Sequence, residues 1–390
     1  MKSRGLFILL FTVFIDLFGF GVVIPILPNY ATRLSGSEVM AGAIVAIYSL
    51  AQLIFNPIWG ALSDKYGRRP VILASNFLNM SGFFLLGFAD DIPTLLFSRL
   101  LSGIGSGNIS AAQAFIADIT PPEKRAKTMG LVGVAFSFGF IFGAPIGGQI
   151  FSHFGFAWLG WGTGILCALN LILSWWILPE SLKEKAGQIR IVIFPVRQIW
   201  QSAIQDRGTG LIFLMGFSYA ASFFLFQLAA NLAWEQEKGL NTEAIAWLFS
   251  VIGLSSGLTQ GLAIGPLTKK FGELQLIRFG IALFIGILLV YPWIPIGWIT
   301  LEVFLLAGLA FSNGLINAPG LSLLSQRHDR QSQGRVIGYY QSVSAAARVV
   351  GPLSAGVLYQ LWMPLPFWTA SGLMSITLFL LWRYWEKKGK

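Results

Sequence analysis

Twelve apolar stretches recur along this chain of 390 residues, and each has the length of a membrane-spanning helix. A bilayer core about 30 Å thick needs roughly 20 apolar residues in helical form. Strands of a membrane barrel would be about ten residues long with strict alternation, which these stretches lack. The sequence therefore predicts an all-α integral membrane protein with twelve transmembrane helices. They cover approximately residues 5–28, 40–62, 70–89, 93–117, 128–152, 156–178, 208–234, 242–264, 275–294, 297–322, 335–361 and 364–385.

Composition excludes several other classes of protein. Only 11% of the residues are charged, whereas soluble domains carry about a quarter. The single cysteine, Cys167, lies in an apolar stretch, and the two histidines, His153 and His328, are far apart in the sequence. We therefore expect neither a metal site nor a disulfide. A phosphate-binding loop for ATP and a nucleophile–base pair are also missing from the sequence, so we predict that the chain needs no cofactor and is not an enzyme.

The basic residues predict the orientation in the membrane. If the amino terminus is cytoplasmic, 23 of the 27 Lys and Arg residues fall at the cytoplasmic side. Arg33 and Lys238 lie in outside loops, and Arg99 and Arg348 lie within spans. Such asymmetry indicates an inner-membrane protein with both termini in the cytoplasm. It also explains the net charge of +10 without nucleic acid as a partner.

The longest connector, residues 179–207, is polar and basic and divides the spans six and six. We interpret it as a cytoplasmic linker between two six-helix bundles, residues 1–178 and 208–390. Within it, the segment Arg190 to Trp200 is expected to form a short interfacial helix.

The two halves share an internal repeat. Glycines and polar residues recur at the same spacing about 205 to 208 residues apart, which indicates two pseudo-symmetric halves of common origin. Parallel repeats of this kind place the substrate site between the halves near the midplane and favour alternating access by rocking. The matching segments are 60–67 with 265–272, 103–108 with 308–313, and 130–143 with 338–351.

The loop after the second span carries the most specific motif, Gly-Ala-Leu-Ser-Asp-Lys-Tyr-Gly-Arg-Arg-Pro over residues 60–70. It resembles the corresponding loop motif of the major facilitator superfamily, and the chain is similar over essentially its whole length to the drug:proton antiporter branch with its tetracycline and multidrug exporters. The resemblance implies a conformational latch on the cytoplasmic side; the alternative is a basic loop that only sets topology. The latch residues would be Gly60, Asp64, Lys65, Gly67, Arg68 and Arg69.

Asp16 in the first span and Arg99 in the fourth are candidates for proton coupling. A carboxylate near mid-span is costly to keep ionised, so its protonation depends on what lies beside it. Counting residues from the ends of the spans places the two side chains about 6 Å apart in height. The resemblance favours a pair or relay. The alternatives are that Asp16 only hydrogen-bonds a neighbouring helix and that Arg99 extends to the outer interface.

The fifth span is similar to the glycine motif of the family's exporters. One departure is that Ala144 directly follows the third glycine, with the proline one position later. That shift moves the expected kink by about 100° around the helix axis and weakens the assignment to antiport. The motif consists of Gly130, Gly139, Gly143, Pro145, Gly147 and Gly148.

Two further charges lie within the predicted spans of the second half. Arg348 either pairs with a buried acid or contacts an anionic substrate, because an arginine in mid-membrane is expensive alone. Glu302 is either that acid or a residue that touches outside water. We place both among the candidate substrate-binding residues, together with the uncharged polar side chains Asn231, Gln227, Tyr340 and Asn317.

Three functional hypotheses follow. The first is a monomeric transporter that exports a small organic molecule in exchange for protons, with Asp16 as the protonation site and Arg99 as its tuner. The second keeps the fold, but Arg99 and Arg348 bind an anionic carboxylate-type metabolite or siderophore, for import or export. The third is a membrane sensor or enzyme on the same scaffold, which lacks an extra domain or catalytic set to support it.

Overall fold

The computed structural model describes residues 2–120, 122–182, 195–328 and 330–386, without the side chains of residues 2–5, 108–109, 122–134, 136 and 330–334. These described residues form helices and contain no strand. The longer helices are α1 (Lys2–Val23), α3 (Glu38–Tyr66), α4 (Arg68–Leu86), α5 (Ile92–Gly105), α6 (Ile109–Ile119), α7 (Pro122–Phe154), α8 (Phe156–Ile177), α10 (Arg207–Gln236), α11 (Thr242–Leu258), α13 (Glu273–Val290), α14 (Ile299–Gln326), α15 (Arg330–Leu361) and α16 (Leu365–Glu386). The shorter elements are α2 (Leu27–Ser35), α9 (Val196–Gln205), α12 (Ile264–Phe271), the 3-10 turns η1 (Ser106–Asn108) and η3 (Tyr291–Trp293), and the π-helical turn η2 (Thr259–Ala263).

Each of the twelve predicted stretches coincides with one helix or with consecutive helices. Within the described residues, eight of them are long and apolar enough to cross a membrane. The predicted first span, 5–28, is too long: α1 ends at Val23, and Pro25 lies in the turn before α2. Proline lacks the N–H that would continue the helix, so the chain breaks there. The fourth predicted span is divided by η1.

The described chain forms two compact units by its contacts. Unit 1 comprises residues 1–36, 47–194 and 241–253, and unit 2 comprises 37–46, 195–240 and 254–390. Each unit contains the larger part of one sequence half. These units have other bounds than the domains expected from the sequence, 1–178 and 208–390. That the two halves move as separate bundles therefore stays a proposal.

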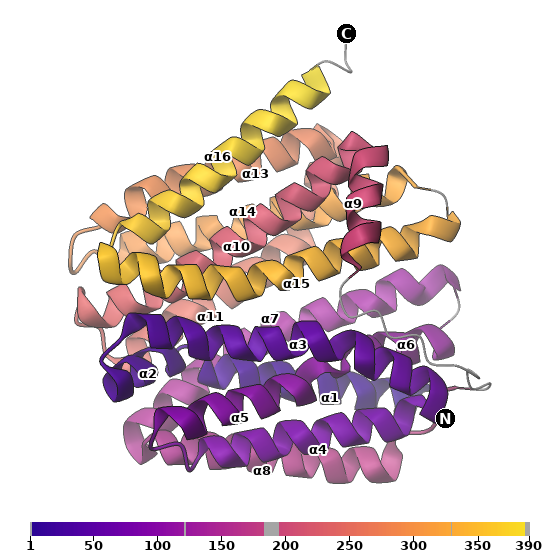
Figure 1. Cartoon of the computed structure of the whole chain (residues 1–390), viewed down its shortest axis with the longest axis vertical. Helices are drawn as coiled ribbons and strands as arrows, with labels where there is room; N and C mark the ends of the chain where they lie inside the picture. Colours follow the sequence, from indigo (N-terminus) through magenta and orange to yellow (C-terminus); the bar gives the residue numbers. More distant parts are fainter. Residues whose placement is uncertain (1, 121, 183–194, 329, 387–390) are drawn as a thin grey trace. The chain divides into compact units, whose positions relative to one another are not determined.

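In unit 1, α1 lies against α7 and α8, and α4 lies against α5 and α8 (Figure 1). A buried apolar cluster joins α1, α4 and α6 through Leu9, Val13, Ile72 and Phe115. In lipid the hydrophobic effect does not favour the association of helices. Close contact between small or complementary side chains must therefore stabilise this packing.

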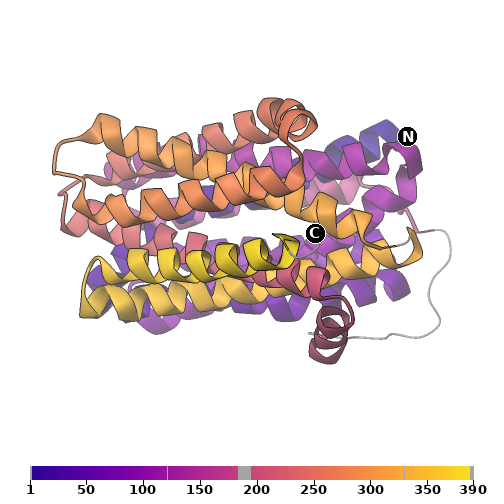
Figure 2. The same ribbon diagram turned by 90° about the horizontal axis from the view of Figure 1, so that it is seen from above.

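In unit 2, α10 lies against α15 and α16, and α13 lies against α14 and α16 (Figures 1 and 2). Aromatic side chains fill its interior: Tyr291 packs edge-on against Phe226 and stacks on Phe367. All three are at most 2% exposed, so this aromatic cluster belongs to the buried core of the unit.

The internal repeat is visible in the backbone. Gly67 has a φ of 112° and precedes α4, and Gly272, at the matching position of the second half, has a φ of 77° and precedes α13. Side chains rarely tolerate positive φ, whereas glycine does at no steric cost. The two loops thus reverse the chain by the same device, in agreement with the repeat read from the sequence.

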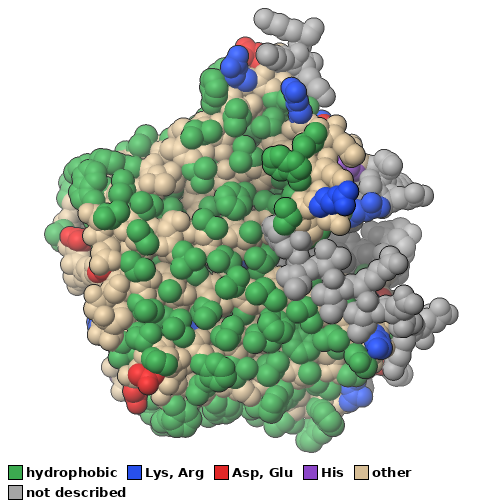
Figure 3. Space-filling view, in the orientation of Figure 1, with side chains coloured by type: hydrophobic (Ala, Val, Ile, Leu, Met, Phe, Trp, Pro, Cys, Tyr) green, Lys and Arg blue, Asp and Glu red, His purple; other side chains and the backbone are tan. Residues whose placement is uncertain are grey.

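The outer surface is apolar between the helix ends. On the face that Figure 3 shows, hydrophobic side chains cover most of the area and charged side chains lie toward the edges. Trp176, Phe304 and Leu262 are each more than 70% exposed. Apolar exposure on this scale marks a surface that contacts something other than water. With its apolar helices, it identifies a multi-pass membrane protein.

Candidate functional site

Asp16 begins a chain of polar side chains through unit 1. It is 9% exposed on α1, and Asn79 of α4 donates from Nδ2 to its Oδ1 at 2.8 Å. Asn79 in turn accepts a hydrogen bond from Ser106 Oγ at 3.2 Å, at the break between α5 and α6. A Cβ on Gly105 would lie 2.7 Å from the Asn79 Cα, so glycine is needed for this close approach. These contacts link α1, α4 and η1 through the Asp16 carboxylate and the Asn79 amide.

A second polar group lies one turn before Asp16 on α1. Thr12 Oγ1 is 3.1 Å from Asn170 Oδ1 and 3.0 Å from Ser174 Oγ, both on α8. These three side chains are at most 2% exposed. Buried polar groups need such partners because an unsatisfied one costs free energy in an apolar medium. Two successive turns of one α1 face are therefore hydrogen-bonded to different helices, Thr12 to α8 and Asp16 to α4.

Arg99 of α5 is buried, with 2% exposure, and contacts side chains of α4 and α5. Nη2 donates to Ser102 Oγ at 3.3 Å, and the guanidinium lies 5.3 Å from the centre of the Phe83 ring. The Nε atom has no hydrogen-bond partner among the described residues. The burial of this side chain argues against the alternative that Arg99 extends to the outer interface.

Asp16 and Arg99 approach the same stretch of α4. Asp16 bonds to Asn79, and Arg99 lies over Phe83 four residues further on, about 6 Å along the helix axis. The Phe83 ring also lies against α1, since a Cβ on Gly19 would be 2.8 Å from its tip. These hydrogen bonds join Asp16 and Arg99 to other side chains, and a pair or relay between the two stays a prediction.

The motif loop of residues 60–70 is held by acids within unit 1. Arg68 Nη1 donates to Asp64 Oδ1 at 2.5 Å and to Ser63 Oγ at 2.6 Å, and Nε donates to Asp118 Oδ2 at 3.1 Å. Although it carries a charge, Arg68 is only 7% exposed. A guanidinium shared by two carboxylates is a strong, directional arrangement. It fixes the loop to the end of α6.

Glu180, just beyond α8, holds the start of α4. Its carboxylate accepts from the backbone N–H of Arg68 at 2.9 Å and of Arg69 at 3.2 Å. An anion at a helix N-terminus is favoured by the unpaired N–H groups and the helix dipole. Elsewhere in the loop, Lys65 lies over the Tyr66 ring, and Gly60 faces Ser110. The sequence analysis missed the roles of Asp118 and Glu180. A signal was available, because each acid stands at the end of an apolar stretch and is followed within a few residues by Lys or Arg.

The α7 glycines form a close contact with α1. A Cβ on Gly139 would lie 2.8 Å from the backbone of Leu17, one on Gly143 2.7 Å from the Phe18 oxygen, and one on Gly147 2.9 Å from the Val22 carbonyl carbon. Spacing by four residues puts all three on one face of α7. The remaining motif members differ: Gly148 faces Ala246 within unit 1, and Pro145 stays inside the continuous helix. The surroundings of Gly130 lie outside the described residues.

Glu302 of α14 belongs to a buried cluster in unit 2. Its Oε1 accepts from Trp234 Nε1 at 2.6 Å and from the Tyr291 hydroxyl, and its Oε2 pairs with Lys238. At 2% exposure, Glu302 is shielded from outside water, which argues against that alternative. Both carboxylate oxygens already have donors on the protein, as a buried charge requires. We call Trp234, Lys238, Tyr291 and Glu302 the carboxylate cluster.

The other candidate substrate-binding residues lie on three helices of unit 2. The Tyr340 hydroxyl on α15 donates to Asn317 Oδ1 on α14 at 3.1 Å, and Asn317 also bonds to Asn313. Gln227 and Asn231 are buried on α10, and Arg348 is half-buried on α15. The structure thus brings Tyr340 and Asn317 together. A binding role for Gln227, Asn231 and Arg348 stays a prediction.

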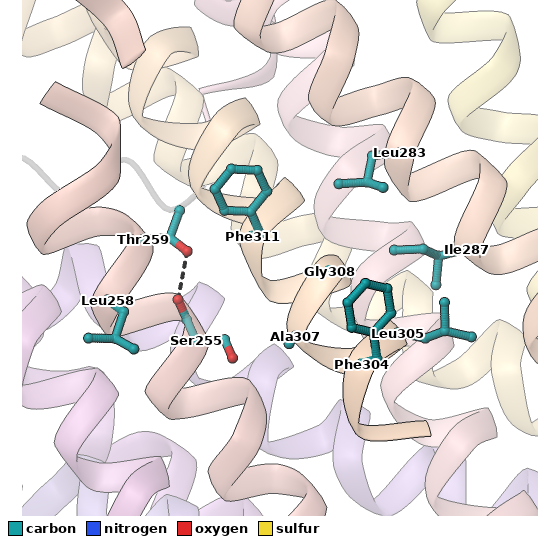
Figure 4. A pocket seen from close by; sticks show the side chains of 10 residues that line it. All are labelled: Ser255, Leu258, Thr259, Leu283, Ile287, Phe304, Leu305, Ala307, Gly308 and Phe311. Carbon is teal, nitrogen blue, oxygen red and sulfur yellow. Dashed lines mark hydrogen bonds between the residues drawn. The ribbon is translucent and has the colours of Figure 1, made fainter. Parts of the chain in front are cut away.

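A cavity of about 460 Å³ lies in unit 2 between α11, α13 and α14 (Figure 4). Its wall is apolar apart from two hydroxyls, and Thr259 donates from Oγ1 to the Ser255 carbonyl oxygen at 2.7 Å. Leu258 and Phe304 are more than half exposed at its rim. The candidate substrate-binding residues are not part of its lining, which consists of Ser255, Leu258, Thr259, Leu283, Ile287, Phe304, Leu305, Ala307, Gly308 and Phe311.

The sequence is similar to known transport proteins over nearly its whole length. The family model for the Major Facilitator Superfamily matches residues 9–352 and, in a second match, 212–390. The tetracycline resistance protein, class C, of Escherichia coli is 29% identical over 374 residues, which are 92% of this chain and 91% of that protein. Multidrug resistance protein 2 of Bacillus subtilis is 27% identical over 403 residues, with 99% and 97% covered.

Solved structures share the fold over nearly all of the chain. The human organic anion transporter MFSD10 (TETRAN) has a TM-score of 0.74 at 24% identity and covers 97% of this chain and 99% of its own. The nucleoside transporter NupG has a TM-score of 0.81 at 12% identity with the same coverage. At these identities the likeness concerns the fold alone.

Proposed function

Because the chain belongs to the Major Facilitator Superfamily, we propose that it is a monomeric secondary active exporter that exchanges protons for a small organic molecule by alternating access. The relatives named for tetracycline and multidrug resistance support export of an amphipathic drug-like compound. The proposed location is the inner membrane with both termini in the cytoplasm, on the charge asymmetry of the loops.

The observation that carries the proposal is the buried Asp16, which accepts a hydrogen bond from the Asn79 amide. An amide can hydrogen-bond a carboxylate or a carboxylic acid, so this neighbour tolerates both protonation states. Burial makes the charged state costly, which is the condition for proton uptake and release coupled to a conformational change. Asp16 would carry the proton, and Arg99, over Phe83 on the same stretch of α4, would tune it.

Other parts of the chain have supporting roles in this proposal. The Arg68 network with Gly60, Asp64, Lys65, Gly67 and Arg69 would act as a cytoplasmic latch. The α7 glycines would let α1 and α7 move as smooth, closely packed surfaces. The substrate would meet the polar side chains of unit 2, which include Gln227, Asn231, Asn317, Tyr340 and Arg348.

The test is transport in proteoliposomes under an imposed pH gradient. We expect Asp16→Asn to abolish uphill drug transport driven by the gradient while drug binding persists. Asp90→Asn, which changes an exposed acid between α4 and α5, is the matched control and should behave as wild type. Unchanged proton dependence in Asp16→Asn would refute the proposed coupling.

A second candidate is transport of an anionic carboxylate-type metabolite or siderophore. The observation that favours it is the buried Arg99 guanidinium, whose Nε has no hydrogen-bond partner among the described residues. A thermal-shift screen across cationic, neutral and polyanionic compounds separates the two candidates. Stabilisation by polyanions that is lost in both Arg99→Gln and Arg348→Ala would favour the anion; stabilisation by cationic drugs alone would exclude it.

A further inference from the structure

Helix α9 carries an exposed apolar stripe. Val196, Trp200 and Ile204 repeat every four residues, so they share one face, and they are 61%, 68% and 62% exposed. The opposite face is polar and carries Gln198 and Gln205. A helix with one strongly apolar and one polar side is typical of segments that lie in a membrane surface.

The direction of α9 fits that position. Figures 1 and 2 show it running crosswise to α10, with which it shares unit 2. Since α10 spans the membrane, a helix that crosses it near its first residue lies along the membrane surface. Ala203 of α9 is packed on α10, because a Cβ on Gly210 would lie 2.8 Å from its carbonyl oxygen. The apolar arc therefore continues from the α10 contact outward onto the exposed stripe.

Asp206 fixes the junction between α9 and α10. Its carboxylate accepts from the backbone N–H of Gly208 and Thr209, both at 3.1 Å, and from Arg327 Nε and Nη2, both at 2.7 Å. These donors hold the pKa of Asp206 well below its usual range. Arg327 also donates to the Tyr384 hydroxyl at 3.3 Å. With its end held to α10, α14 and α16, α9 has little freedom to turn its stripe away.

Positive charge flanks the stripe. Arg197 and Arg207 are both exposed, at the first turn of α9 and just after its end. Basic residues beside an apolar face favour anionic lipid headgroups, and Trp is enriched at the headgroup level. We propose that α9 lies in the membrane surface with Val196, Trp200 and Ile204 inserted among the lipids and with Arg197 and Arg207 selecting anionic headgroups.

Site-specific fluorescence tests the proposal without any transport assay, so its outcome is independent of the proposed exporter function. Single cysteines replace Ile204 or, as the matched control on the polar face, Gln198, in a Cys167→Ala background. Each is labelled with an environment-sensitive dye in full-length protein, one copy per nanodisc. The quenchers are a phospholipid spin-labelled near its headgroup and a water-soluble anion.

We expect the lipid-borne quencher to reduce the fluorescence of Ile204→Cys at least about twofold more than that of Gln198→Cys. The soluble quencher should reduce the fluorescence of Gln198→Cys more than that of Ile204→Cys. Replacing about one third of the phosphatidylcholine by phosphatidylglycerol should increase the lipid quenching at Ile204→Cys, and Arg197→Gln with Arg207→Gln should remove that increase. Val196→Cys is the second variant and should repeat the result.

Four results would overturn the inference or one of its parts. Equal lipid quenching at both faces would show that the stripe is not inserted. Protection of Ile204→Cys from both quenchers would show that protein covers it. Self-quenching of the dye only in discs with two copies, without lipid quenching, would make the stripe an interface between copies. An unchanged signal on adding phosphatidylglycerol would refute the selection of anionic headgroups.

Discussion

At the scale of single residues, the stability of the carboxylate cluster depends on the balance between the Glu302 and Lys238 charges. Glu302→Gln leaves the Lys238 ammonium, whose side chain is 11% exposed, without its counter-charge. Breaking a buried pair by removing one partner costs about 3–5 kcal/mol. We therefore expect a large fall in the thermal unfolding temperature of the purified protein, with little change in the drug specificity of the fraction that stays folded.

The matched control for that prediction is the double variant. Lys238→Met added to Glu302→Gln removes the second charge and should recover at least part of the lost stability, since neutral replacements of buried pairs are often tolerated. A double variant no more stable than the single one would mean that the hydrogen bonds from Trp234 and Tyr291, and not the ion pair, carry the stability.

Asp206 predicts a pH dependence of stability. Its pKa is lowered in the folded protein, chiefly by the Arg327 hydrogen bonds. Its contribution is thus fully present above the unfolded value of about 3.9 and is lost as pH falls through the lower folded value. Asp206→Asn keeps a capping oxygen for α10 but loses the charge, at a cost of about 1 kcal/mol or less. The gap in unfolding temperature from wild type should be constant from neutral pH down to about pH 4 and close below it; a gap that widens on acidification would contradict this.

At the scale of elements, hydropathy and glycine spacing predicted most of the fold. Apolar length located the twelve spans because lipid forces every backbone group into internal hydrogen bonds. Side-chain partners were less predictable, since Arg68 meets Asp118 and Glu180 far along the chain. The expected interfacial segment, Arg190 to Trp200, begins outside the described residues. It ends inside α9, which continues to Gln205.

The contact of α1 with α7 gives a prediction at the same scale. Gly143→Ala places a methyl group 2.7 Å from the Phe18 carbonyl oxygen, so the helices must separate. We expect lower thermal stability and reduced transport. Gly162→Ala in α8 is the control, because its added Cβ meets nothing within 4 Å and should stabilise by about 0.5–1 kcal/mol. Equal loss in both variants would argue against a specific α1–α7 contact.

At the scale of the whole molecule, the repeat preserves backbone turns better than charge. The turn glycines Gly67 and Gly272 match, but the ion pairs of the two units do not. In unit 1 the arginine is in the loop and the acid ends α6, as Arg68 with Asp118; in unit 2 the arginine follows α14 and the acid precedes α10, as Arg327 with Asp206. The sequence repeat could predict the shared turn, whereas the ion pairs depend on contacts between elements far apart in the chain.

Orientation in the membrane is the remaining property of the molecule as a whole, and the loop charges predict it. Lys and Arg are retained on the cytoplasmic side during insertion, so the loops that carry 23 of the 27 should stay inside. In a Cys167→Ala background, single cysteines at the exposed positions Asp90 and Asn241 should react with a membrane-impermeant maleimide in intact cells. Cysteines at Lys269 and Glu386 should react only after permeabilisation, and the opposite pattern would reverse the proposed topology and with it the side on which the Arg68 network acts.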